Sequence, residues 1–171
     1  DPVADGPIIM KAGRKAIDEG SNINFIFDEL IKNKNTISSK YVLMTYYNIL
    51  SAYGEKLFLD KCDEAGVYGL IIPDLPCELT KKFKKEFYHH SVKIISLIAM
   101  TASDARIMQI AKNSEGFIYT VTMNATTGNS GEFHPDLKRK IEYIKKVSKI
   151  PVVAGFGIKN PEIGRASCRE R

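Results

Sequence analysis

The chain has 171 residues, of which 44% are hydrophobic and 26% charged, proportions that are ordinary for a globular domain. This length allows one sizeable hydrophobic core. The longest apolar runs are strand-sized, far below the roughly 18 residues that a membrane helix needs, so we expect no membrane segment. The chain begins at Asp1 rather than at a methionine, and we expect further residues to precede it.

The formal net charge of +5 raises the question of a nucleic-acid partner. The lysines are spread over predicted helix faces, and the one local run, at residues 81–85, has helical spacing. We interpret it as a solvated face and expect no nucleic-acid partner. The three cysteines, Cys62, Cys77 and Cys168, have neither metal-ligand nor disulfide spacing, which is typical of a protein of the reducing cytoplasm.

Helical and strand-like segments alternate along the chain. Helices are predicted over residues 7–19, with Pro7 in the first turn and Gly20 as the stop, and over residues 24–34. Five short apolar runs are candidate strands: residues 41–45, 69–72, 93–98, 117–121 and 151–154. These runs are continuous rather than alternating, which is typical of parallel strands covered on both faces.

Amphipathic helices separate the candidate strands. Their apolar residues recur at helical spacing: Phe58, Cys62 and Ala65; Leu79, Phe83 and Phe87; Leu137, Ile141 and Ile144. Successive strands begin about 23 to 35 residues apart, the period of a βα unit, so we predict a single α/β domain. The pattern alone does not distinguish a barrel from an open, doubly wound sheet.

The last nine residues have a different character. Residues 163–171 are encoded residue for residue by ATC GGA AGA GCG TCG TGT AGG GAA AGA, which reads like a translated sequencing adapter. We expect the native reading frame to end at or just before Glu162, so that residues 1–162 form the domain and residues 163–171 a non-native tail. Without the three arginines and one glutamate of the tail, the net charge falls from +5 to +3.

In both α/β architectures the functional loops follow the C-terminal ends of the strands. Gly155, Phe156 and Gly157 follow the last candidate strand, where glycines let the backbone approach an anion; a plain βα turn is the alternative. The polar, glycine-rich residues 126–131 suit a lid over a site, or an ordinary surface loop. Asp5 lies in a loop rich in proline and glycine, where it either caps the helix that starts near Pro7 or acts in a site.

The order and spacing of several segments resemble the tryptophan synthase alpha subunits. The segments are DPVADGP at residue 1, LMTYYN, IIPDLP, GFIYTVT, TTG and PVVAGFGI, and they extend from Asp1 to Glu162. DPVADGP is the most specific of them, and TVTMNATTG is similar to the form found in some Gram-positive bacterial members. The resemblance implies a TIM (β/α)8 barrel. We therefore expect a partial barrel in which the first and last βα units are missing.

The resemblance also implies a lyase that cleaves indole-3-glycerol phosphate by a retro-aldol step, without a metal or an organic cofactor. In such a site Asp5 holds the indole N–H, and Tyr119 approaches the catalytic centre from the sixth barrel strand. Thr127 contacts the loop that carries Asp5. The family's acid/base glutamate lies on the strand before DPVADGP, upstream of Asp1, so we expect the chain as given to be nearly or wholly inactive.

Substrate-binding positions follow from the same resemblance. Met44, Tyr46, Pro73 and Ile98 match residues that line the apolar indole pocket, although core packing is an alternative explanation for each. Gly128 and Gly157 match positions that offer backbone N–H groups to the phosphate. Gly155 and Phe156, next to Gly157, are predicted to bind substrate as well.

The family works as an α2β2 complex with a beta subunit, and Asp1 and Pro2 are the predicted contacts to that partner. One rival hypothesis is another phosphate-binding barrel, such as indole-glycerol-phosphate synthase; its catalytic lysine belongs at a strand end, whereas Lys93 stands at a strand start. A second rival is a non-catalytic protein that only activates a beta subunit. A third, nucleic-acid binding, predicts a steeply salt-dependent affinity.

Overall fold

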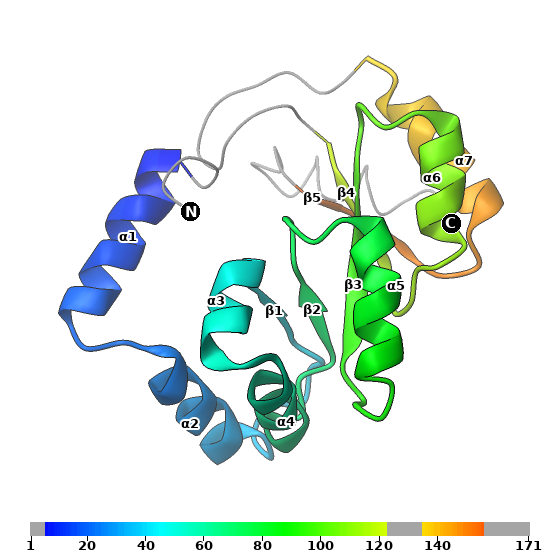
Figure 1. The fold of residues 1–171 in the computed structure, drawn as a ribbon. Helices are drawn as coiled ribbons and strands as arrows, with labels where there is room; N and C mark the ends of the chain where they lie inside the picture. Colours follow the sequence, from blue (N-terminus) through cyan, green and yellow to red (C-terminus); the bar gives the residue numbers. More distant parts are fainter. Residues whose placement is uncertain (1–5, 123–134, 156–171) are drawn as a thin grey trace.

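A computed structural model describes residues 6–122 and 135–155 of the chain. Two helices precede a series in which strands and helices alternate (Figure 1). The elements are α1 (Gly6–Asp18), α2 (Ile23–Asn33), β1 (Val42–Met44), α3 (Tyr47–Tyr53), α4 (Glu55–Ala65), β2 (Gly69–Ile71), α5 (Cys77–Glu86), β3 (Lys93–Ala99), α6 (Asp104–Ala111), β4 (Ile118–Val121), α7 (Leu137–Val147) and β5 (Val152–Gly155).

The five strands form one sheet in the order β1-β2-β3-β4-β5, and every neighbouring pair is parallel. Strands that follow one another in sequence therefore also lie side by side in the sheet. A doubly wound sheet reverses its strand order at a switch point, and these five strands show no reversal. The topology decides between the two architectures that the sequence left open: the described residues form part of a β/α barrel, as predicted.

Helices cover the outer face of this sheet (Figure 1). Two clusters of buried side chains fill the space between the sheet and the helices, one under α2 to α5 and one under α6 and α7. Leu70 and Ile94 belong to the first cluster, and Ile98 and Ile118 to the second. Because side chains alternate along a strand, the residues between them point to the other face of the sheet. We call that second face the inner face.

The predicted strands and the two predicted N-terminal helices agree with the observed elements to within one or two residues. Helix α3 is an addition, because no helix was predicted directly after the first strand. Tyr46 instead stands at the N-cap of α3, and the Tyr47 N–H donates to the Asp74 carboxylate, with Oδ1 at 2.9 Å. An anionic side chain is favourable at a helix N-terminus, so Asp74 ties the loop after β2 to the start of α3.

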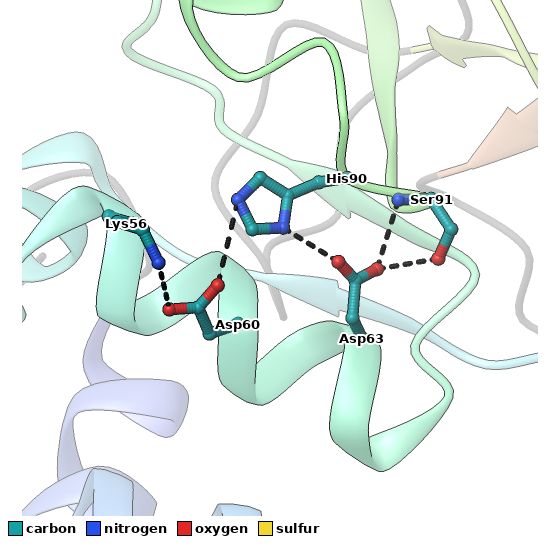
Figure 2. Close-up of polar contacts among 5 residues, drawn as sticks. All are labelled: Lys56, Asp60, Asp63, His90 and Ser91. Atoms are coloured by element: carbon teal, nitrogen blue, oxygen red, sulfur yellow. Dashed lines mark hydrogen bonds and ion pairs between the residues drawn. The ribbon is translucent and has the colours of Figure 1, made fainter.

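A polar cluster joins α4 to the segment before β3, near the N-terminal ends of the strands (Figure 2). The Asp63 carboxylate accepts hydrogen bonds from the Ser91 N–H at 3.0 Å and from its hydroxyl at 2.5 Å. His90 Nδ1 lies 2.6 Å from the other Asp63 oxygen, and the His90 side chain is 3% exposed. Asp60 faces His90 Nε2 at 3.8 Å and pairs with Lys56 at 2.7 Å. The cluster fastens α4 to the start of β3.

Several predicted site residues lie outside the described residues. They are Asp1, Pro2, Asp5, Thr127, Gly128, Phe156 and Gly157. The predicted non-native tail at residues 163–171 lies outside them as well.

Candidate functional site

The strand register brings residues of the inner face together at the C-terminal edge of the sheet. Leu97, Tyr119 and Val153 are aligned across β3, β4 and β5, and the next inner row is Ala99, Val121 and Gly155. In a parallel β/α sheet the loops at this edge carry the functional groups. This edge is therefore the candidate site.

Tyr119 and Gly155, both predicted as site residues, are in direct contact. A Cβ atom built on Gly155 would overlap the Tyr119 hydroxyl and ring, so the phenol lies against the Gly155 backbone. Burial raises the pKa of the Tyr119 hydroxyl, which keeps the side chain a neutral phenol able to donate a hydrogen bond. The sequence places a glycine where the tyrosine requires space.

Two buried threonines hold the last strand in place beneath this contact. The Thr120 hydroxyl donates to the Val153 carbonyl at 2.9 Å. The Thr122 hydroxyl donates to the Gly155 carbonyl at 2.7 Å, and its backbone N–H donates to the same oxygen at 3.2 Å. Buried hydroxyls are stable when they are hydrogen-bonded, and here both serve carbonyls of β5. The position of Gly155 is thereby fixed relative to β4.

Apolar side chains line the inner face from β1 to β3. Met44 is aligned with Ile71, and Ile71 with Ile95, so the three side chains share that face. Ile71 and Ile95 are the buried apolar residues of the described chain that belong to neither outer cluster. Met44 is 53% exposed at the end of β1. These residues form an apolar wall beside Tyr119.

The loops after β1 and β2 stand next to this wall. Tyr46 and Pro73, both predicted to line the pocket, follow these two strands. The Tyr47 N–H, at the start of α3, donates to Asp74 in the loop after β2, and this bond ties together the two segments that carry Tyr46 and Pro73. The structure thus brings Met44, Tyr46 and Pro73 to one edge of the sheet.

The prediction for Ile98 is corrected. Ile98 is fully buried in the outer cluster with Ile107 and Ile144, on the opposite face of the sheet from Tyr119. Leu97 pairs with Tyr119 and occupies the inner-face position that was assigned to Ile98. Leu97 and Ile98 are both apolar, and β3 has no regular alternation from which to choose between the two residues.

A separate cavity of ≈490 Å³ lies between α5 and α6 over β3. Arg106 and Lys84 line it; Arg106 forms an ion pair with Glu78, and Lys84 pairs with Glu115 at 3.1 Å. The Arg106 side chain lowers the pKa of the Glu78 carboxyl to about 2. Pro73 is the one predicted site residue in its lining; β3 contributes Ile95, Leu97 and Ala99, and the basic lining residues come from α5 and α6. We therefore place the candidate site at the inner face.

Within residues 6–122 and 135–155, no group of three acidic, histidine or cysteine side chains is arranged to hold a metal ion. Over the same ranges, none of the helices combines the length and apolar character that crossing a bilayer requires.

A parallel sheet of this topology, with a tyrosine over a glycine at its C-terminal edge, is compatible with several phosphate-binding barrels, so comparison with known proteins decides among them. The family profile described as "Tryptophan synthase alpha chain" matches residues 1–167. The chain belongs to the tryptophan synthase alpha chain family.

Relatives in this family are close. A tryptophan synthase alpha chain of Staphylococcus epidermidis (strain ATCC 12228) is 97% identical over 162 residues, which are 95% of this chain and 67% of the relative. One from Staphylococcus aureus (strain MRSA252) is 62% identical with the same coverage. This chain therefore spans about two thirds of the length of the tryptophan synthase alpha chains that it matches.

Solved structures of tryptophan synthase agree with the fold. A chain from the Pyrococcus furiosus tryptophan synthase α2β2 complex has a TM-score of 0.85 at 29% identity, covering 97% of this chain and 67% of that one. Tryptophan synthase subunit alpha from Campylobacter jejuni has a TM-score of 0.84 at 31% identity, with coverage of 98% and 67%. The described sheet is thus the corresponding part of a tryptophan synthase alpha barrel.

Proposed function

We propose that this chain carries most of the substrate site of a lyase that cleaves indole-3-glycerol phosphate to indole and glyceraldehyde 3-phosphate. The observation that carries the proposal is the contact of Tyr119 with Gly155 at the C-terminal edge of the sheet, beside an apolar wall. A flat aromatic substrate needs such a wall, and a phosphate needs backbone N–H groups that glycines leave accessible.

The site residues that the structure describes have the following roles in this proposal. Met44, Leu97 and the loop residues Tyr46 and Pro73 line the indole pocket. Tyr119 presents a neutral phenol to the reacting centre. Gly155 begins the phosphate loop, which continues into Phe156 and Gly157.

The remaining roles rest on the family resemblance. Cleavage of the carbon–carbon bond requires a proton at C3 of the indole and loss of a proton from the glycerol hydroxyl, which suits carboxylate groups. Asp5 holds the indole N–H and stabilises the positive charge that develops on the ring, an effect that favours the transition state. Thr127 contacts the Asp5 loop, and Gly128 binds phosphate. The acid/base glutamate precedes Asp1, and no cofactor takes part.

The partner is a tryptophan synthase beta subunit in an α2β2 complex, with Asp1 and Pro2 at the interface, and the setting is the cytoplasm. The related tryptophan synthase of Pyrococcus furiosus is an α2β2 complex with mutual activation, which supports this assembly. Residues 1–162 form the working part of the chain in this proposal, and residues 163–171 are not native.

The test compares Asp5→Ala with the unchanged protein, both extended to the full length of the Staphylococcus epidermidis relative. We expect the unchanged protein to form indole from indole-3-glycerol phosphate, and Asp5→Ala to lose about a hundredfold or more of kcat, since one electrostatic contact in a transition state has this weight. Binding of the product analogue indole-propanol phosphate should persist. Unchanged turnover in Asp5→Ala would refute its role. A full-length protein that forms no indole but activates a beta subunit would establish the non-catalytic alternative.

A further inference from the structure

Three buried polar residues of the described chain lie near the C-terminal ends of β3 to β5. They are Thr120, Thr122 and Lys140, with exposed fractions of 0%, 2% and 7%. Thr120 and Thr122 lie on the outer face of β4 and donate to carbonyls of β5. Lys140 comes from α7 and reaches the end of β3. All three lie behind the inner-face row of Ala99, Val121 and Gly155.

Lys140 is the one charged residue among these three. Its ammonium group donates to the Met100 carbonyl and, at 2.7 Å, to the Ala102 carbonyl. These carbonyls belong to the turn between β3 and α6, directly after Ala99. The same turn contains a hydrogen bond from the Ala102 N–H to the Ala99 carbonyl at 3.0 Å. Lys140 thus closes the turn from outside by binding two of its oxygens.

Burial of an ammonium group is costly unless its hydrogens are bound, and two neutral carbonyls are weaker partners than a carboxylate. The neighbouring cation on α7 lies at the surface: Arg139 pairs with Asp104 on α6 at 3.1 Å and remains half exposed. Pairing at the surface would therefore suffice to attach α7 to α6. What the buried amine adds is a fixed position for the carbonyls that end β3.

We propose that Lys140 is a positioning residue for the substrate site, acting through the β3–α6 turn on Leu97 and Ala99. This proposal rests on the proposed function, because those two residues line the inner face where the indole is placed. In the register of the sheet, Ala99 is aligned with Val121 and Val121 with Gly155. A shift at the end of β3 would therefore also displace Val121 and Gly155, which are aligned with Ala99 in this row. Lys140, Thr120 and Thr122 together form a set of anchors behind this row.

The test uses Lys140→Met, which keeps the length of the side chain and removes its donors. Lys138→Met is the matched control, because Lys138 is an exposed lysine in the same helix. In a chain of the relatives' full length, we expect Lys140→Met to lower kcat for indole formation about tenfold to a hundredfold, the cost of a misplaced site. KM should stay within about twofold of the unchanged value. Lys140→Arg, which restores donors, should recover part of kcat, and Lys138→Met should change neither constant.

Hydrogen exchange provides a second readout on the same full-length chain. The Ala102 amide should exchange about tenfold faster in Lys140→Met and at the original rate in Lys138→Met. If Lys140→Met does not fold, Lys140→Gln, which keeps a shorter donor group, replaces it and should lower kcat and speed Ala102 exchange in the same direction. A folded Lys140→Met or Lys140→Gln with unchanged kcat and exchange would overturn the proposal. Absence of indole formation in the unchanged full-length protein would count against the proposed function instead, and the exchange rate would still decide the role of Lys140.

Discussion

At the scale of single residues, the site depends on the Tyr119 side chain, which fills the space that a side chain at Gly155 would need. The Tyr119 phenol covers the backbone of Gly155, and the Thr122 hydroxyl holds the carbonyl of that glycine from the other face. A methyl group at position 155 has no room unless the tyrosine moves, and the half-buried ring has little freedom to do so. The requirement for glycine here is steric and follows from the neighbouring strand.

Gly155→Ala is therefore expected to destabilise the fold by about 1–3 kcal/mol, the usual cost of overpacking. The control is Gly13→Ala in α1, where an added Cβ meets no atom within 4 Å and alanine favours the helix. Thermal unfolding of both variants measures the difference. Tyr119→Val should relieve most of the cost of Gly155→Ala, because it removes the overlapping ring. A Gly155→Ala variant as stable as Gly13→Ala would show that the ring does not occupy this space.

At the scale of the elements, a polar cluster attaches α4 to the segment that starts β3 (Figure 2). Partial burial alone would raise the pKa of the Asp63 carboxyl, but hydrogen bonds from Ser91 and His90 outweigh it and lower the pKa. An ionised carboxylate only accepts hydrogen bonds, so His90 Nδ1 carries the proton in this contact. The charge on Asp63 is thus part of the attachment.

Because the pKa of Asp63 is lower in the folded chain than in the unfolded chain, its contribution to stability is present above about pH 4. It is lost as the pH falls through the lowered value. Asp63→Asn should reduce the free energy of unfolding at neutral pH by about 1–3 kcal/mol, since the amide keeps one acceptor oxygen and turns an NH2 donor toward either His90 or Ser91, and should flatten its decline in acid. Asp28→Asn, at an exposed position on α2, serves as the control. Denaturant unfolding between about pH 3 and 7 measures both, and parallel curves for the two variants would contradict the assigned role.

The sequence predicted the strands to within one or two residues because each is a short apolar run bounded by helical patterns. Ile98 was assigned to the pocket from the family resemblance, and because Leu97 and Ile98 are both apolar, the strand pattern offered no correction. Lys140 was also missed. A lysine in an amphipathic helix is usually on the solvated face, and its burial depends on carbonyls about 40 residues away in sequence. Tyr119 and Gly155 were each predicted as site residues, but the contact between them was not predicted.

At the scale of the whole molecule, the described sheet is an arc of a barrel whose inner face is partly open. Met44 and Val153, at opposite ends of the sheet, are 53% and 42% exposed. Helix α1 carries exposed apolar side chains as well, among them Ile8 and Ile17. This chain covers 67% of the tryptophan synthase alpha chains that it matches, which accounts for an arc rather than a closed barrel. The function of the site therefore has to be measured in a chain of that full length.

The most direct test of the account is to map the binding of indole-propanol phosphate to such a full-length chain by NMR of its methyl groups. The indole is expected to lie on the inner face, so the signals of Met44 and Leu97 should shift on binding while Ile98, in the outer cluster, stays unchanged. Shifts at Ile98 without shifts at Met44 and Leu97 would contradict the placement of the substrate site on the inner face of the sheet.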